Sequence, residues 1–279
     1  MFRGDFDYLK VAAAASVHVA PSASPRRQHS RARNLYGFMT TDLLDFARQP
    51  LSDDVRKSIL NGVLTGLVEL HDRRIIHTGQ QPNSVADIKP RNILINHDEM
   101  VAAGQELTVR QVRISDFEDA VQLDPGKSLR GCLCGNEFWR SPESWARVKQ
   151  SLTSDVYSFG IVAIYVMLKH MVFRVPDEQL DGDNDWRHIL WRHISYFADE
   201  EGLEGLVRHI GREDPYIERL VALAGDFGPV KPRESFALWH YADAEFPDVV
   251  DKMTNLDPAR RITAREALEH PWFQAAELV

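Results

Sequence analysis

The sequence of 279 residues has only two cysteines and no apolar run long enough for a membrane span. A spanning helix needs roughly 18 or more consecutive apolar residues, and the apolar stretch Val156–Leu168 is shorter than that. The net charge is −8, so nucleic acids and membrane surfaces, which are themselves negative, are poor partners. We therefore expect a globular protein with neither a membrane nor a nucleic-acid partner.

The two cysteines, Cys132 and Cys134, are separated by one residue. A zinc site needs further ligands at suitable spacing, and a secreted disulfide framework uses more cysteine pairs. The sequence has neither pattern. We expect two free thiols in a reducing compartment, the cytoplasm or the nucleus.

Residues 1–34 differ in composition from the rest of the chain. An alanine-rich stretch, Val11–Ala20, is followed by prolines and by four arginines up to Arg33. A basic leader of this kind can be a transit peptide, but such peptides avoid acidic residues, and Asp5 and Asp7 are present. We expect a poorly ordered leader over residues 1–34.

Two long helices are predicted from the spacing of apolar residues. The segment Asp53–His71 repeats apolar residues at helical intervals, with Ser52 as N-cap and acidic residues in the first turn. Val156–Leu168 is apolar almost all round, which is typical of a helix buried inside a larger domain.

Smaller elements are predicted on either side of the second helix. Short β-like runs at Ile93–Ile95 and Val112–Ile114 are separated by a polar stretch, which predicts a hairpin. Near the end of the chain, Thr263 and Glu266 have the spacing of a capping box. Pro271 is expected to close the helix that this box begins.

Two motifs have the composition that phosphoryl transfer requires: Asp87-Ile-Lys89-Pro-Arg-Asn92 and, later, Asp116-Phe117. The reaction depends mainly on positioning and charge neutralisation. It needs a carboxylate that orients the attacking hydroxyl and takes its proton, a cation at the transferred phosphate, and oxygen ligands for Mg²⁺. Asp87 and Lys89 supply the first two. Asn92 and Asp116 supply the third.

These motifs resemble the catalytic loop and the metal-binding segment of serine/threonine protein kinases. Further matches to the family follow in the family's order: Trp139-Arg-Ser141-Pro142-Glu143, Ser154-Asp155-Val-Tyr-Ser-Phe-Gly160, and the closing run Leu256-Asp257-Pro258-Ala-Arg-Arg261 with His270-Pro-Trp-Phe273.

The resemblance implies a fold that is mainly α with small β elements. It is a protein-kinase-like C-lobe over residues 35–276, with the N-lobe sheet largely missing. Within it, the catalytic loop would cover residues 77–95, the activation segment 116–143 and the C-terminal helical subdomain 154–273. The implied cofactors are ATP and Mg²⁺, and the implied partner is a protein, either substrate or binding partner.

The resemblance also implies roles for individual residues. Asp87 and Lys89 would be catalytic. Asn92 and Asp116 would bind Mg²⁺ and, with Leu94 as the floor of the adenine pocket, ATP.

Three further residues would be scaffold. Glu143 and Arg261 would form a buried ion pair that ties the activation segment to the lobe. Asp155 would accept backbone hydrogen bonds from the catalytic loop.

The chain departs from the family pattern within the site. Residues 79–86 are inserted just before Asp87, and their composition predicts a surface loop. Glu118 stands where the family has glycine after Asp-Phe, which restricts the backbone. No arginine precedes Asp87, so Ser128 is a weak candidate for a regulatory phosphate.

The largest departure lies upstream of the expected hinge at Leu35–Met39. A kinase has there a sheet with a glycine-rich phosphate loop, a strand lysine and its glutamate partner. Residues 1–34 contain no Gly-x-Gly-x-x-Gly. We therefore expect poor retention of ATP.

Three interpretations stay open. The chain is a protein kinase that transfers the γ-phosphate of ATP to serine or threonine, impaired as written. Alternatively, it is a pseudokinase or lobe-only interaction module. The third alternative is a truncated gene model of an active kinase, in which both the missing N-lobe and the 79–86 insertion are artefacts.

Overall fold

The computed structural model describes residues 19–20, 39–77, 87–98, 108–176, 178, 185–239 and 243–274. Of the leader expected over residues 1–34, it describes only Val19–Ala20, which form the short strand β1. The rest of that leader, most of the expected hinge and the 79–86 insertion lie outside the described residues. Within the described part, no helix has both the length and the apolar character needed to cross a bilayer.

The first long helix forms where the apolar spacing predicts it. After the one-turn helix α2 (Leu43–Phe46), α3 covers Asp53–Asp72. The Ser52 side chain accepts a hydrogen bond from the backbone N–H of Val55, at 3.4 Å, which satisfies one of the free donors of the first turn. The prediction of this helix and of its cap is confirmed.

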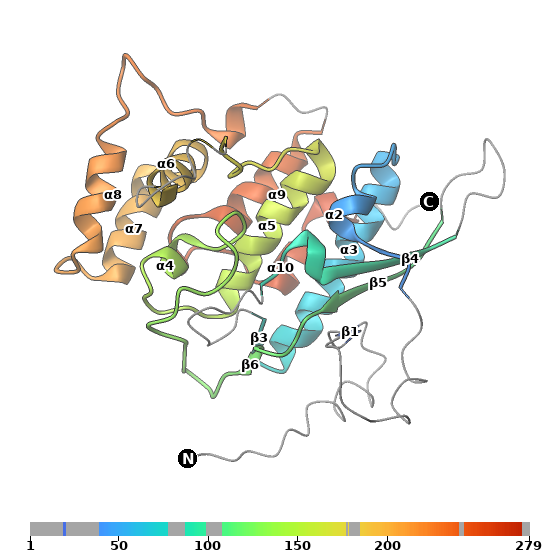
Figure 1. The fold of residues 1–279 in the computed structure, drawn as a ribbon. Helices are drawn as coiled ribbons and strands as arrows, with labels where there is room; N and C mark the ends of the chain where they lie inside the picture. Colours follow the sequence, from blue (N-terminus) through green and yellow to red (C-terminus); the bar gives the residue numbers. More distant parts are fainter. Residues whose placement is uncertain are drawn as a thin grey trace.

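The predicted hairpin is confirmed as β4 (Ile93–His97) and β5 (Val109–Ser115), which pair antiparallel. It lies inside a sheet of order β1-β5-β4-β2, in which β2 is Thr41–Asp42. A second sheet joins β3 (Ile75–Ile76) to β6 (Val121–Gln122). In Figure 1 the hairpin lies at one side of the molecule, next to α3.

The centre of the molecule is α5 (Leu152–Leu168), the predicted apolar helix, whose residues from Ser154 to Val166 are all buried. It packs closely against α9 (Glu245–Thr254). A Cβ at Gly160 would lie 2.7 Å from Cγ2 of Thr254, so only glycine allows the two helices this separation. Figure 1 shows α5 between the hairpin side and the group formed by α6, α7 and α8.

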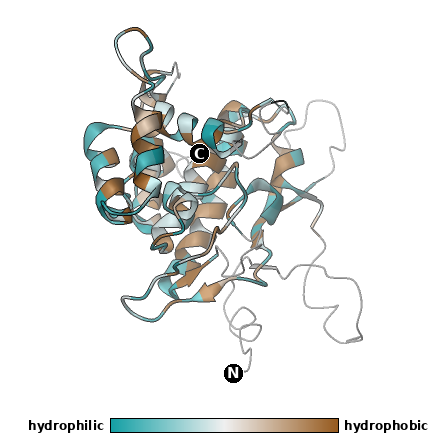
Figure 2. Cartoon of the chain, turned by 60° about the vertical axis from the view of Figure 1, so that its left-hand side comes forward, coloured by the Kyte–Doolittle hydropathy of each residue, from teal (hydrophilic) through white to brown (hydrophobic). Residues whose placement is uncertain are grey.

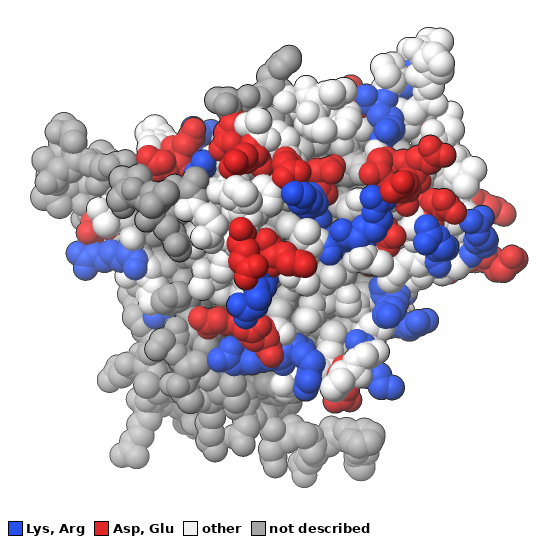
Figure 3. All heavy atoms as spheres, turned by 180° about the vertical axis from the view of Figure 1, so that it is seen from behind, with Lys and Arg blue, Asp and Glu red and all other residues white. Residues whose placement is uncertain are grey.

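The remaining elements complete a mainly helical body with small sheets. Their bounds are α4 Pro142–Trp145, α6 Asp185–Phe197, α7 Glu200–Ile210, α8 Tyr216–Ala224, α10 Ala264–Leu268, α11 Pro271–Gln274, and 3₁₀ turns at Pro90–Asn92 and Phe236–Leu238. Figure 2 shows hydrophobic residues recurring along the central helices, and Figure 3 shows acidic and basic side chains interspersed over the rear face.

The capping box predicted near the end of the chain is confirmed. Thr263 Oγ1 accepts from the N–H of Glu266 at 3.1 Å, and the Thr263 N–H donates to Glu266 Oε2 at 2.7 Å. As predicted, α10 ends just before Pro271, which lies two residues after the C-cap Glu269. Pro271 also begins α11, because proline suits the first position of a helix.

A buried ion pair joins α4 to the loop before α10, as the family resemblance predicted. Arg261 Nη1 and Nη2 lie 2.6 and 2.7 Å from the two carboxylate oxygens of Glu143, and both side chains are fully buried. Burial by itself raises the pKa of the Glu143 carboxyl, but the charge and hydrogen bonds of Arg261, with a hydrogen bond from Ser154, outweigh it. The pKa of Glu143 is therefore lowered.

Replacing one partner of this pair should strongly destabilise the fold. Arg261→Met leaves the Glu143 carboxylate buried without its cation, which costs roughly 3–5 kcal/mol of unfolding free energy. Urea unfolding of wild type and variant measures the difference. The matched control is Arg260→Met, which removes the neighbouring arginine from an exposed pair with Glu201. The control should unfold almost as wild type does. Equal losses from both variants would contradict a special role for Arg261.

Candidate functional site

The catalytic loop is anchored at its start by buried hydrogen bonds. The His77 N–H donates to Asp155 Oδ2 at 2.9 Å, and His77 Nε2 donates to the carbonyl of Ser115 at 2.8 Å. His71 Nε2 also lies 3.3 Å from Asp155 Oδ2. Asp155 is fully buried at the start of α5 and, as predicted, accepts a backbone hydrogen bond from this loop.

Asp87 lies at the centre of the predicted site and has partners at its carboxylate and at its carbonyl. Its Oδ1 is 3.0 Å from Lys89 Nζ, and its Oδ2 accepts from the N–H of Asn136 at 2.6 Å. Its carbonyl accepts from Asn92 Nδ2 at 3.0 Å. The structure thus brings Asp87, Lys89 and Asn92 together, as the motif predicts. Asp87 is only 1% exposed.

Burial dominates the ionisation of Asp87. It raises the pKa of the carboxyl, because removal from water disfavours the charged form. The charge of Lys89, the Asn136 N–H and His77 act in the opposite direction, but they do not cancel the effect of burial. A carboxylate with a raised pKa is a better proton acceptor at neutral pH than an exposed aspartate.

Two residues that the sequence reasoning missed cover Asp87: Gly135 and Asn136. Gly135 has a left-handed backbone, with φ +80°. A Cβ at this position would lie 3.2 Å from Asp87 Cβ and 3.3 Å from Asp87 Oδ2. The activation segment therefore approaches Asp87 as closely as a residue without a side chain permits. The glycine just before the Asn-Glu-Phe-Trp-Arg-Ser-Pro-Glu run was the available signal.

The two predicted metal ligands lie at one end of the β4–β5 hairpin. Asn92 immediately precedes β4, Asp116 immediately follows β5, and Ile93 pairs with Ile114. Ser115 Oγ donates to the Asn92 carbonyl at 3.0 Å, which ties the two chain ends together. Since Nδ2 of Asn92 donates to the Asp87 carbonyl, Oδ1 is the Asn92 atom that would bind a metal, together with the Asp116 carboxylate. These hard oxygen ligands fit Mg²⁺.

Asp116 has a strained backbone. Its φ is +68°, in the left-handed region that non-glycine residues seldom adopt. Such strain costs on the order of 1–3 kcal/mol and is concentrated at functional sites. The next residue, Phe117, contacts His77 edge to face, with ring centroids 4.9 Å apart. Glu118, which replaces the family glycine, is exposed.

Leu94 stays a predicted nucleotide contact. It lies on β4 between Ile93 and Ile95, which are both fully buried on the core face. Because side chains alternate along a strand, Leu94 points to the other face, where it is half-buried.

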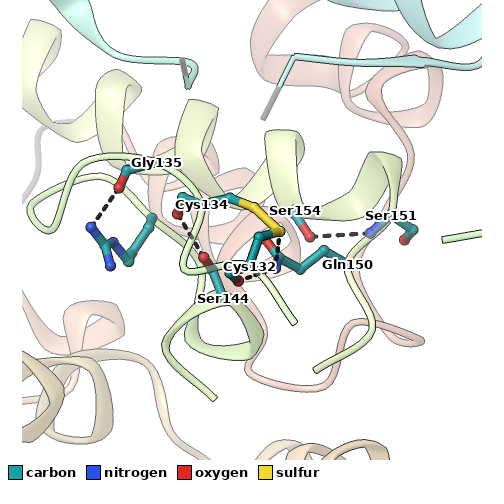
Figure 4. The surroundings of a disulfide bond; sticks show 8 residues. Cys132, Cys134, Gly135, Ser144, Gln150, Ser151 and Ser154 are labelled. Atoms are coloured by element: carbon teal, nitrogen blue, oxygen red, sulfur yellow. Dashed lines mark hydrogen bonds between the residues drawn. A yellow bond between two sulfur atoms is a disulfide. The ribbon is translucent and has the colours of Figure 1, made fainter. Parts of the chain in front are cut away.

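The expectation of two free thiols is wrong in this structure, since Cys132 and Cys134 form a disulfide. The bridge lies just before Gly135 and is held from both sides (Figure 4). Gln150 Nε2 donates to the Cys132 carbonyl at 3.0 Å, and Ser144 Oγ donates to the Cys134 carbonyl at 2.6 Å. The sequence did not predict the bridge, because this single pair closes a local turn and does not belong to a framework of several cysteine pairs.

Comparisons with known proteins match most of this chain. Residues 34–273 match the family described as protein kinase domain. The chain is 27% identical over 237 residues to serine/threonine-protein kinase hippo of Drosophila melanogaster, covering 85% of this chain and 26% of that protein. It is 29% identical over 263 residues to mitogen-activated protein kinase spm1 of Cytospora mali, covering 90% and 54%. It is 30% identical over 246 residues to mitogen-activated protein kinase pmk-1 of Caenorhabditis elegans, covering 85% of this chain and 54% of that protein. The chain thus spans from about a quarter to about half of these relatives' lengths.

Substituting the glycine that touches Asp87 should disturb the site beyond ordinary backbone strain. Gly135→Ala and Gly131→Ala both place a side chain at φ +80°, at a cost of roughly 1–2 kcal/mol each. A Cβ at position 131 meets nothing within 4 Å, whereas one at position 135 meets Asp87. Thermal unfolding should therefore show Gly135→Ala as the less stable variant. Indistinguishable unfolding curves would contradict the close approach.

Alkylation should report the state of the cysteines. Purified chain unfolded without reductant and treated with iodoacetamide should carry no label at Cys132 or Cys134, and should carry label at both after reduction. Peptide mass spectrometry reads both positions. Label at either cysteine before reduction would restore the free-thiol expectation.

Proposed function

This chain belongs to the protein kinase family, and on that premise we propose that it transfers the γ-phosphate of ATP to serine or threonine of proteins, with impaired efficiency. The family match and the mainly helical body with small sheets confirm the expected kinase-like C-lobe. The observation that carries the proposal is the Asp87 carboxylate, held by Lys89 Nζ and by the activation segment within one buried loop.

The proposed chemistry follows from the contacts of these side chains. Asp87 orients the acceptor hydroxyl and takes its proton as the oxygen attacks the γ-phosphorus and ADP leaves. Lys89, 3.0 Å from Asp87, balances charge on the transferred phosphoryl group. Asn92 and Asp116 would hold Mg²⁺, which supplies neutralisation of the phosphate charge when bound. Leu94 would support the adenine ring.

Impairment is proposed from three features of the chain. The sequence contains no Gly-x-Gly-x-x-Gly that would cover the phosphates. Glu118 adds negative charge and restricts the backbone beside Asp116. Asp87 is 1% exposed, so an acceptor hydroxyl reaches its carboxylate only after neighbouring residues move. The same burial favours the second candidate function, a pseudokinase that binds partner proteins through this lobe.

We propose a protein partner, no nucleic-acid or membrane partner, and a location in the cytoplasm or nucleus. The acidic balance of the chain supports the first two statements. The Cys132–Cys134 disulfide bears on the proposed location, because disulfides in the cytosol are usually transient and respond to redox state.

Mg-ATP titration should separate nucleotide binding from chemistry. For the wild type, the thermal midpoint should rise with Mg-ATP by mass action, by roughly 2.7 kcal/mol of stability at a hundredfold excess over Kd. Asp116→Ala should lose this shift, because a metal ligand is removed. Asp87→Asn should keep the shift but transfer labelled phosphate to a general protein substrate at least about 100-fold more slowly.

Asp87→Asn also supplies an internal control. Because burial raises the pKa of Asp87, its ionised form costs stability at neutral pH, and a neutral amide should leave the midpoint equal or higher. No shift of the wild type at millimolar Mg-ATP would contradict the enzyme proposal and leave the interaction module.

A further inference from the structure

A cavity of about 320 Å³ lies beside the activation segment. Its walls come from the activation segment, α4, the residues just after α4, α6 and α8. The proposed catalytic chemistry uses none of its lining residues. Its volume is at the lower end of the range for small-ligand sites, so it suits one side chain rather than a nucleotide.

Three residues that line this cavity carry hydrogen-bond donors that lack acceptors. Among the described residues, no acceptor is paired with Nε and Nη1 of Arg140, Nε1 of Trp145 or the hydroxyl of Tyr216, and all four atoms are buried. Buried polar groups are nearly always paired, because leaving one unpaired costs about 1–3 kcal/mol. Unpaired donors around one cavity indicate a ligand that accepts hydrogen bonds.

The charge of the cavity selects an anion. Three of its lining residues are arginines, Arg140, Arg147 and Arg219, against one acid, Glu137, which gives +2 for the lining set. The whole chain has a net charge of −8, so this is a local excess of positive charge. Burial lowers the pKa of Arg140 to about 10, and its guanidinium remains charged at neutral pH.

Aromatic rings hold two of these guanidinium groups in place. Arg140 lies 4.6 Å over the Trp145 ring, and Arg219 lies 4.8 Å over the Trp186 ring. A stacked guanidinium keeps its N–H groups in its own plane, so they remain free for a planar or tetrahedral oxyanion. Such preorganisation favours phosphate over a single weak acceptor.

The cavity is connected to the catalytic loop by one side chain. Arg140 Nη2 donates to the carbonyl of Gly135, the residue whose backbone touches Asp87. The charge of Asp87 in turn acts on Arg140. A peptide that presents a hydroxyl to Asp87 must therefore pass close to the cavity wall.

We propose that this cavity binds a phosphorylated side chain of a protein substrate or partner that docks along the activation segment. The identification of that peptide as a substrate rests on the proposed function, whereas the binding itself does not. A carboxylate side chain shares the chemistry but has fewer acceptor oxygens and less charge, so it should bind more weakly.

Fluorescence anisotropy without ATP tests the proposal on the full chain at about 0.15 M salt, where long-range attraction is screened. The probes are three fluorescein-labelled glycine-alanine peptides with a central phosphoserine, glutamate or serine. The phosphoserine peptide should bind at least about tenfold more tightly than the serine peptide, with glutamate between them. Equal binding of phosphoserine and serine peptides would overturn the proposal.

Variants locate the bound peptide. Arg147→Gln and Arg219→Gln, both at exposed arginines of the cavity rim, should each weaken the phosphoserine peptide about tenfold. Arg208→Gln removes an exposed arginine of α7 outside the cavity and should leave the affinity unchanged. Wild-type affinity in both rim variants would place the phosphate elsewhere and overturn the proposal.

Tyr216→Phe tests the buried wall without opening it. Removing a hydroxyl that has no partner should leave the thermal midpoint equal or higher, yet weaken the phosphoserine peptide severalfold. Inorganic phosphate is the competitor: displacement of the peptide at a concentration near the peptide's own Kd would show a free-anion site and overturn the peptide occupant. Since no measurement includes ATP, a chain that fails the Mg-ATP titration can still bind the phosphopeptide.

Discussion

The buried ion pair between Glu143 and Arg261 is the contact on which the candidate site depends. Its two short hydrogen bonds fix α4 against the loop before α10, and Ser154 at the start of α5 adds a third to Glu143. α4 directly follows the segment of the chain that covers Asp87. With both charges fully buried, neither partner can separate without stranding the other, so the end of the activation segment has one position.

The catalytic loop and the activation segment constrain one another at Asp87. The start of the loop is fixed by the hydrogen bond from His77 to Asp155. The activation segment covers Asp87 through Gly135 and Asn136. Burial makes the Asp87 carboxyl a stronger base and also removes it from solvent. Burial thus both favours proton transfer to Asp87 and limits access to it. The kinase and interaction-module interpretations therefore rest on the same physical property.

Local patterns were sufficient to predict much of the fold and some of the site. Helical spacing with an N-cap serine predicted α3, and the Thr263–Glu266 capping box formed because both of its hydrogen bonds lie within one turn. The grouping of Asp87, Lys89 and Asn92 was predictable because the three residues are close in sequence and contact one another within a single loop. The disulfide and the approach of Gly135 were not, because each depends on where a separate segment returns.

The sequence by itself determined the family and the mainly helical body, and it predicted a group of residues for phosphoryl transfer, because these follow from short-range periodicity and from motif order. The tertiary structure decided what surrounds those residues. It placed Asn136 against Asp87 from 49 residues away and joined Glu143 to Arg261 across 118. It also gathered Arg140, Arg219 and Tyr216 around one cavity. Burial, unpaired hydrogen-bond donors and local charge depend on the neighbours of a residue, and these neighbours are brought together only when distant segments pack.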